Sequence, residues 1–170
     1  MTVLGFYLLL VFSPENVIGS WLQDWFGIRL LFSFSGLVIG SVIYSLPFMV
    51  NPIQSGLSGI PTSLVEASYV LGKSKIKTLW DILLPNIRPS LLTGIVLTFA
   101  HTVGEFGVVL MIGGNIPEKT KVVSIAIYDE VEALNYSQAN MYSLILLIIT
   151  FVILLSVYAI NGGYLKRFWK

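Results

Sequence analysis

The sequence predicts an all-α membrane protein, a polytopic bundle of transmembrane helices. The first observation is composition: of 170 residues, 55% are hydrophobic and only 11% are charged, whereas soluble domains average about 25% charged residues. The second is that residues 30–50 and 141–160 contain no charge, and each is close to the roughly 20 apolar residues with which a helix crosses the hydrocarbon core. Because so few charges cannot give the chain a polar surface, we expect lipid to be its main solvent.

Composition also excludes several kinds of function. A net charge of +1 gives no indication of nucleic-acid binding. The chain has no cysteine, which rules out disulfides, thiolate metal sites and cysteine nucleophiles. Its single histidine, His101, cannot alone build a histidine-rich metal site, and the sequence has no Walker A, nucleophile-elbow or zinc motif. We therefore predict no catalytic residue, no cofactor and no metal.

The first apolar segment, residues 1–12, is short for a span. "TVLGFYLLLVF" is apolar for 11 residues and stops at Ser13-Pro14, which is about half of a crossing. A cleavable signal peptide would begin with basic residues, and this segment has none. We expect a partial span whose front half is missing, so that the chain is N-terminally truncated and has about four spans with the first incomplete.

Three complete spans are expected at 30–50, 91–112 and 141–160. The middle one differs from the others because it contains His101 and Glu105. We treat the whole chain, residues 1–170, as a single transmembrane domain.

The basic residues orient these spans. Seven lie in the loop 51–89 and the tail 161–170, and three lie in the loops 13–29 and 113–140. Cytoplasmic loops of membrane proteins carry the excess of lysine and arginine. The loop 51–89 and the C-terminal tail are therefore expected in the cytoplasm, and the loop 113–140 outside.

The cytoplasmic loop contains a predicted pair of helices. Pro61 can occupy the first helical position, although Ser63 with Glu66 also fits a capping box, so that the start is open by a residue or two. Gly72 stands where a left-handed residue would end the first helix. Ser74 can then cap the second helix.

The second helix of the loop is amphipathic. Its apolar residues recur at i, i+3, i+4, i+7 and i+8: Ile76, Leu79, Trp80, Leu83 and Leu84. Pro85 is expected to end it. Taken alone, the pattern fits an interfacial helix whose lysines are held by anionic membrane lipid.

The spacing of the loop also resembles a more specific pattern, the EAA loop of ABC importer permeases, written E-A-A-x3-G-x9-I-x-L-P. The matching residues are Glu66, Ala67, Ser68, Gly72, Ile82, Leu84 and Pro85. The third position departs, with Ser68 in place of alanine, which is a small-for-small change. The resemblance implies a MetI-like permease fold and a loop that fits a groove on a cytoplasmic ATPase subunit.

The predicted span 91–112 carries an ionisable pair. His101 and Glu105 are four residues apart, so on a continuous helix they share a face and can form a hydrogen bond or ion pair. Gly104 and Gly107 leave that face without side-chain bulk, which permits close helix approach or a locally opened backbone. Because ionisable residues inside a span are costly, their presence favours a functional role.

A second resemblance concerns the same span. Gly104-Glu105-Phe106-Gly107 followed by Gly114-Asn115-Ile116-Pro117 is similar to the molybdate permease branch of the ABC importers, whose relatives move tungstate, sulfate and thiosulfate. "SLPFMV" at 45–50 and the segment at 2–12 also resemble that branch. Asn51-Pro52 departs from it, because relatives often carry a basic residue there. The resemblance covers essentially the whole chain.

Four interpretations of His101 and Glu105 are compared at this stage. A metal site has too few ligands, and direct oxyanion binding by Glu105 is opposed by charge repulsion. A pair that only locks helix packing is the structural alternative. The resemblance favours a pathway or gate at a subunit interface, with these candidate residues: His101, Thr102, Gly104, Glu105 and Gly107.

The external loop has a helical pattern of its own. Val123, Ile127, Val131 and Leu134 are spaced for one face of a short helix, which we expect to lie on the membrane surface. In the permease family, outward loops meet a substrate-loaded binding protein.

The resemblance thus implies the non-catalytic transmembrane subunit of an oxyanion importer in a bacterial inner membrane, with molybdate as the leading cargo. It implies a homodimer with two cytoplasmic ATPase subunits and an extracytoplasmic substrate-binding protein as partners. Two alternatives are a tungstate or sulfate/thiosulfate permease, and a truncated, transport-inactive membrane protein that still binds the ATPase.

Overall fold

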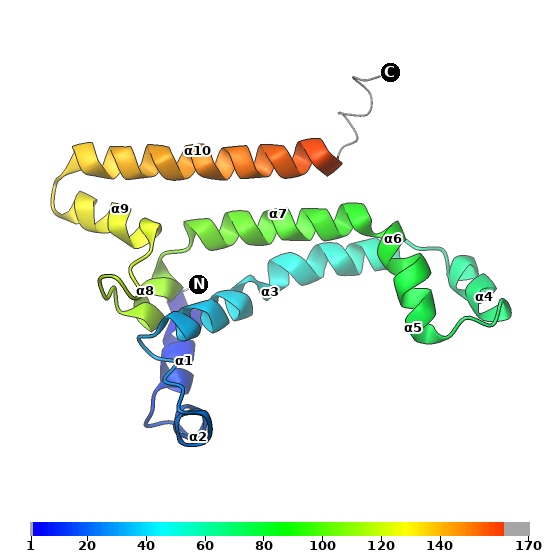
Figure 1. Cartoon of the computed structure of the whole chain (residues 1–170), viewed down its shortest axis with the longest axis horizontal. Coiled ribbons are helices and arrows are strands. Elements are labelled where there is room, and N and C mark those ends of the chain that lie inside the picture. Colours follow the sequence, from blue (N-terminus) through cyan, green and yellow to red (C-terminus); the bar gives the residue numbers. More distant parts are fainter. Residues whose placement is uncertain (1, 162–170) are drawn as a thin grey trace. The chain divides into compact units, whose positions relative to one another are not determined.

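Every regular element in the described part of the chain is helical, which confirms the predicted all-α class. The computed structural model describes residues 2–161 (Figure 1), so all of the predicted tail except Asn161 lies outside the described residues. In chain order the elements are α1 (Thr2–Phe12), α2 (Val17–Phe26), α3 (Phe34–Ser58), α4 (Thr62–Val70), α5 (Lys75–Thr78), the π-helical turn η1 (Leu79–Leu83), α6 (Leu84–Asn86), α7 (Arg88–Gly104), α8 (Gly107–Gly113), α9 (Val123–Glu132) and α10 (Tyr136–Asn161).

Two of the described helices are long and apolar enough to cross a membrane on their own. Among residues 2–161, α3 and α10 each meet the length and composition of a span. Two bent pairs also meet them together: α1 with α2, which bend by 47°, and the segment Lys75–Asn86 with α7, which bend by 73°. The described part of the chain therefore has between two and four candidate crossings, as expected for a polytopic membrane protein.

The chain divides into two compact units. Within the described residues, the first comprises residues 2–45 together with His101–Val152, and the second comprises Leu46–Ala100 together with residues 153–161. Each unit is described by itself.

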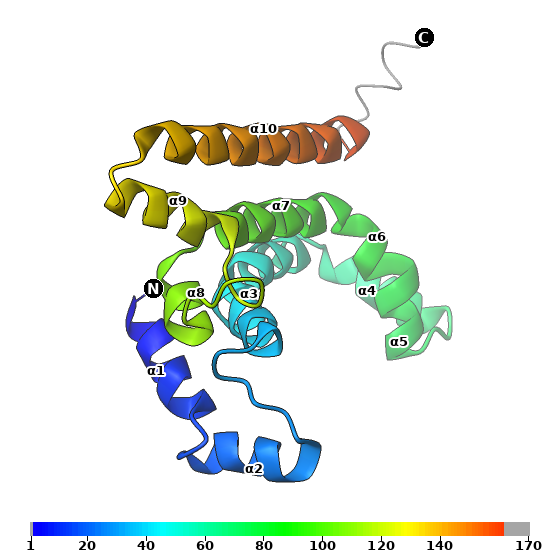
Figure 2. The same ribbon diagram turned by 60° about the vertical axis from the view of Figure 1, so that its left-hand side comes forward.

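The first unit is organised around the short helix α8. One apolar cluster joins α8 to α1 and α3 through Leu8, Phe12, Leu30, Tyr44, Val108 and Ile112. A second cluster joins it to α3 and α9 through Leu37, Val109 and Ile125. α1 lies directly against α8 (Figure 2). A Cβ atom at Gly5 would lie only 3.2 Å from the Cα atom of Val108, so glycine permits this close approach.

Helix α2 forms where a loop was expected. Its start is capped by Asn16, whose side-chain oxygen accepts a hydrogen bond from the Ile18 amide. Its end is a left-handed glycine, Gly27, with φ of 63°. Both are ordinary capping residues, and apolar content alone did not reveal them.

Helix α3 runs further than its predicted span of 30–50. It continues through Pro47 and Pro52 and ends at Ser58. Proline removes one helical hydrogen bond, but such breaks are tolerated in membrane helices because neighbouring groups satisfy the backbone again. The residue pattern therefore marked the apolar core of this helix rather than its end.

Candidate functional site

The first candidate site is the hairpin of α4 and α5 in the second unit, which carries the EAA-like residues (Figures 1 and 2). Pro61 has φ of −60° and ψ of 134°, and it is the N-cap of α4 rather than its first helical residue. Ser63 and Glu66 lie inside the helix, which begins at Thr62, within the residue or two that the sequence left open. Ala67 and Glu66 are both exposed on α4.

The turn after α4 confirms the predicted left-handed glycine. Gly72 has φ of 75°. Its amide donates to the Tyr69 carbonyl at 2.9 Å, and the Lys73 amide donates to the Ser68 carbonyl at 3.1 Å. These two bonds form a Schellman motif, which closes a helix end by satisfying its last carbonyls. No heavy atom lies within 4 Å of a Cβ built at Gly72, so glycine is needed here for conformation and not for space.

Ser68, the residue that departs from the EAA pattern, has a specific partner. Its hydroxyl lies 2.9 Å from that of Thr78 and 2.8 Å from the Val65 carbonyl. Since Ser68 donates to the carbonyl, Thr78 donates to Ser68. Both side chains are almost fully buried, so this contact fastens α4 to α5.

The second helical segment begins as predicted and ends later. Ser74 is its N-cap and accepts a hydrogen bond from the Lys77 amide at 3.3 Å. Pro85 does not end it, because the segment passes through η1 and continues to Asn86. A proline ring clashes with the carbonyl four residues earlier in a regular α-helix, and the wider π-turn just before Pro85 relieves that crowding. The Asn86 side chain donates to the Ile82 carbonyl at 2.7 Å.

Four large apolar side chains of the hairpin region are exposed instead of packing within it. Val70, Leu71, Ile76 and Trp80 are between 67% and 87% exposed, whereas Ile82, Leu84 and Pro85 are half-buried. We call the first four the apolar surface of the hairpin.

One of the loop lysines is paired within the hairpin. Lys73 lies 2.8 Å from the Asp81 carboxylate, and this hydrogen bond holds the pKa of Asp81 below its ordinary value. Lys75 and Lys77 are exposed. The turn therefore combines a fixed ion pair with two solvated positive charges.

The second candidate site is the break between α7 and α8 in the first unit. The predicted span 91–112 is not one helix, because α7 ends at Gly104 and α8 begins at Gly107. Glu105 thus follows α7 instead of lying on it, which corrects the expected shared helical face. The pair still meets: the Nε2 atom of His101 and the Oε2 atom of Glu105 are 3.8 Å apart. The His101 ring also packs edge-on against Tyr44, with ring centroids 5.6 Å apart.

Glu105 is built into the start of α8. Its Oε1 atom accepts a hydrogen bond from the Val108 amide at 3.1 Å, and its carbonyl accepts one from the Ser124 hydroxyl at 2.9 Å. The side chain is 8% exposed. A carboxylate that caps a helix N-terminus is favoured by the amides and dipole there, which explains why a carboxylate persists in an apolar surrounding.

The other candidate gate residues shape the same break. The Glu105 amide donates to the Thr102 carbonyl at 3.3 Å. No heavy atom lies within 4 Å of a Cβ built at Gly104, and one at Gly107 would approach only the Glu105 carboxylate, at 3.8 Å. The structure therefore brings His101, Glu105 and Gly107 together, while Thr102 contributes its backbone.

The external loop is fastened by polar contacts that sequence reasoning did not find. Asn115 donates to both carboxylate oxygens of Asp129 at 3.1 Å, and Lys121 lies 2.6 Å from the same carboxylate. The lysine, followed by the asparagine, lowers the pKa of Asp129. The buried Thr120 hydroxyl donates to the Gly113 carbonyl at 2.6 Å. No sequence spacing could have revealed contacts between residues up to 14 positions apart.

The predicted helix of this loop exists, with a shorter extent than its apolar pattern. α9 includes Val123, Ile127 and Val131, but Leu134 lies beyond its end and has φ of 58°.

Comparison with known proteins gives a consistent result. A family described as "Binding-protein-dependent transport system inner membrane component" matches residues 1–170. The chain is 45% identical over 159 residues to the "Molybdenum transport system permease protein ModB" of Azotobacter vinelandii, covering 93% of this chain and 70% of that protein.

Two further relatives show the breadth of the match. The "Probable sulfate transport system permease protein cysT" of Zygnema circumcarinatum is 36% identical over 163 residues, which cover 96% of this chain and 55% of the relative. The ModB protein of Escherichia coli K12 is 36% identical over 126 residues, or 74% of this chain and 55% of the relative. The chain thus spans about half the length of these two.

Proposed function

The chain belongs to the family of binding-protein-dependent transport system inner membrane components, and on that basis we propose that it is the permease subunit of an ATP-driven molybdate importer. In this role it forms part of the translocation pathway and couples it to a separate cytoplasmic ATPase. The chemistry of ATP hydrolysis belongs to that partner.

Similarity supports molybdate as the cargo. The relative at 45% identity is named as a molybdenum transport permease, whereas the relative named for sulfate is 36% identical. Sulfate is therefore the second candidate cargo, and both are tetrahedral oxyanions of the same charge.

The geometry of the hairpin carries the coupling role. A Schellman turn at Gly72 and the buried contact of Ser68 with Thr78 fix α4 against α5. This rigid base presents the apolar surface of the hairpin, Val70, Leu71, Ile76 and Trp80, to its surroundings. A rigid element with exposed apolar anchors suits insertion into a groove of a protein partner. We infer that this partner is the ATPase.

A gate role is proposed for the break between α7 and α8. Glu105 joins three elements, since it lies near His101 of α7, caps α8 and is bonded through its carbonyl to Ser124 of α9. A residue that links three helices at a break can transmit movement from one helix to the others. In the proposal Thr102, Gly104 and Gly107 give a passing anion room and polar contacts.

The remaining partners follow from the same role. We propose a homodimer in a bacterial inner membrane, with the C-terminus in the cytoplasm and the loop 113–140 facing the extracytoplasmic binding protein. One observation bears on packing against a second copy: the most apolar stretch of α10 is not buried by any other part of the described chain. Such a face requires lipid or other helices.

The test measures binding and transport separately. Membranes carrying the chain with its cognate ATPase and binding protein are assayed for co-purification of the ATPase and for ATP-dependent uptake of labelled molybdate, with tungstate and sulfate as competitors. We expect co-purification, and competition by tungstate at lower concentration than by sulfate. Co-purification without uptake would support the transport-inactive alternative, and loss of both would reject the proposed function.

A further inference from the structure

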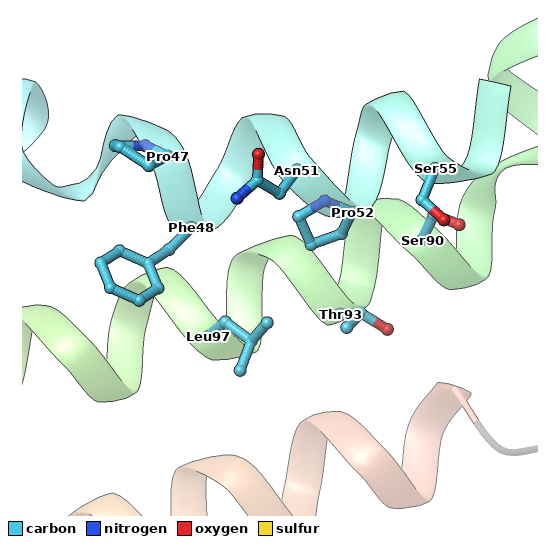
Figure 3. Close-up of a pocket in the computed structure, with 8 residues that line it drawn as sticks. All are labelled: Pro47, Phe48, Asn51, Pro52, Ser55, Ser90, Thr93 and Leu97. Carbon is cyan, nitrogen blue, oxygen red and sulfur yellow. The ribbon is translucent and has the colours of Figure 1, made fainter. Parts of the chain in front are cut away.

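A groove on the second unit is lined by four polar and four apolar residues, and the preceding roles do not use its polar side chains. It lies between the later part of α3 and the first turns of α7, and its volume is about 400 Å³ (Figure 3). Asn51 and Ser55 of α3 and Ser90 and Thr93 of α7 supply its polar side chains, and Phe48 and Leu97 close one end.

The two helices that form the groove are held in close contact by glycines. A Cβ at Gly94 would lie 3.2 Å from the Met49 carbonyl oxygen, and one at Gly56 would overlap the Ser90 side chain. Close backbone approach of this kind fixes one membrane helix against another. The groove is therefore a built feature of the helix pair and does not depend on a mobile loop.

The polar residues occur at helical spacing on both helices. Asn51 and Ser55 are four residues apart, and Ser90 and Thr93 are three apart, so each pair shares one helix face. α3 has the length and composition of a membrane span. Polar side chains on such a helix face a water-filled cavity or another polar surface, because contact with hydrocarbon is costly. A lipid-facing role for this groove is thus disfavoured.

The donor set fits an anion that must be released again. No ionisable side chain is among the residues that line the groove. Thr93 already donates to the Pro89 carbonyl at 3.0 Å, which leaves the Asn51 amide and the Ser55 and Ser90 hydroxyls as donors for a ligand. Neutral donors make charge-assisted hydrogen bonds to an anion, but they place no opposite full charge beside it that would hold it in the groove. Passage through a pore needs sites that are favourable enough to enter and weak enough to leave.

From these observations we propose that the groove lines the route of a tetrahedral oxyanion, with Asn51, Ser55 and Ser90 donating hydrogen bonds to it. The inference rests on the proposed function and deepens it by naming a transit site. The site belongs to the same unit as the hairpin that we propose contacts the ATPase.

The absence of native cysteine makes the test direct. Single cysteines are placed in the groove by Asn51→Cys, Ser55→Cys and Ser90→Cys, and outside it by Leu46→Cys and Val50→Cys, which are exposed on the same helix α3 within the predicted span 30–50. Membrane vesicles holding the chain assembled with its ATPase and binding protein are treated with an anionic thiosulfonate that does not cross lipid. Since both the thiolate and the reagent need water, we expect labelling in the groove to be about tenfold faster or more than at the controls.

Occupancy is tested in the same vesicles. We expect molybdate, added with ATP and the binding protein, to slow labelling at the three groove positions and leave the controls unchanged. Equal labelling at groove and control positions would overturn the inference, as would fast groove labelling that molybdate does not affect.

A comparison of two leucine substitutions tests the transit site without cysteine labelling. Asn51→Leu removes the amide donor, and Gln54→Leu makes the same chemical change on an exposed residue of α3 outside the groove. We expect Asn51→Leu to reduce molybdate uptake about tenfold, since it removes a hydrogen bond to a charged ligand, and Gln54→Leu to have little effect. ATPase co-purification should stay intact in both. Equal uptake by the two variants would reject the transit site, whereas failure of the unchanged chain in uptake and co-purification would reject the proposed function itself.

Discussion

The hairpin of α4 and α5 and the break between α7 and α8 are both places where a helix stops, and different interactions stop it. In the hairpin the contacts are local: the Schellman bonds close within six residues of chain, and Ser68 and Thr78 are ten residues apart. At the break, Glu105 is bonded to Ser124, 19 residues away.

Distant contacts dominate the rest of the break as well. Val108 and Ile112 of α8 pack into a cluster with Leu8 and Phe12 from the beginning of the chain. The comparison teaches that the hairpin is a self-contained unit of sequence, whereas α8 exists as a separate helix because α1, α3 and α9 surround it. Changes at the break should therefore spread further than changes in the hairpin.

The largest effect is expected at Glu105. Glu105→Ala removes the cap of α8 and leaves the buried Val108 amide without its acceptor, and an unsatisfied buried donor costs about 1–3 kcal/mol. Thermal unfolding of the detergent-extracted protein measures the loss. Glu105→Gln keeps an oxygen that can accept the Val108 amide, so this variant should retain part of the stability. If Ala and Gln are equally destabilising, capping is not the role of Glu105.

The interaction energy between Glu105 and His101 can be measured with a double-mutant cycle. We expect His101→Ala and Glu105→Ala together to cost less than the sum of the two single changes, by about 0.5 kcal/mol or more, because the residues face each other in a partly buried site. Additive losses would mean that the 3.8 Å approach contributes no interaction energy.

The next effect is expected in the hairpin, where Gly72→Val forces a β-branched residue into a left-handed conformation. The backbone cost is about 1–2 kcal/mol. Because the effect is local, we expect loss of ATPase co-purification and of stimulated ATP hydrolysis while membrane insertion stays normal.

Two control variants accompany this change. Gly72→Asn should be milder than Gly72→Val, since asparagine tolerates positive φ, and Lys77→Arg should do little on an exposed position. Normal coupling by Gly72→Val would leave the hairpin as a lipid-surface helix pair and remove the main support for its role.

A smaller effect is expected for the hydroxyl contact. Ser68→Ala restores the alanine of the EAA pattern but leaves the buried Thr78 hydroxyl without its acceptor, which costs about 1 kcal/mol. Ser68→Ala with Thr78→Val removes both partners and should recover most of that loss. Hydrogen exchange at the hairpin amides gives the readout, and a double variant less protected than Ser68→Ala would contradict the contact.

The smallest effect is expected for the Lys73–Asp81 ion pair, which is exposed to solvent. The pKa of Asp81 in the folded protein lies below its ordinary value of 3.8. The stabilisation from the ion pair is therefore complete above pH 3.8, and it is lost as the pH falls through the folded pKa. Asp81→Asn should therefore be slightly less stable than the parent at neutral pH and equal to it in strong acid. A difference that grows in acid would have the wrong sign.

These two regions also show how far the sequence could predict the structure. Gly72 and Ser74 were predictable because glycine and serine determine helix ends through their own backbone and side-chain geometry. The end at Pro85 was predicted too early, because a π-turn accommodates the proline ring. The α7–α8 break was one of two possibilities that Gly104 and Gly107 left open, because nothing near Glu105 in the sequence indicates that Ser124 will bond its carbonyl.

The candidate sites divide in the same way. The EAA-like residues were located from spacing, but the partner of Ser68 was not, since Thr78 has no special position in the pattern. The polar groove depends on two helices meeting at Gly56 and Gly94, and each helix alone shows only scattered serine, threonine and asparagine. The periodicity of residues along one helix does not show which other helix will pack against it.

The π-turn η1 sets the angle at which the hairpin is presented. An α-helix turns by about 100° for each residue, and a π-turn absorbs one additional residue without breaking the helix. Deleting one residue from Leu79–Leu83 could therefore leave a continuous helix, yet Ile76 and the residues before it would be rotated by about 100° about the axis relative to α6. An insertion or deletion in this segment that folding tolerates would therefore still turn the apolar surface of the hairpin away from the ATPase.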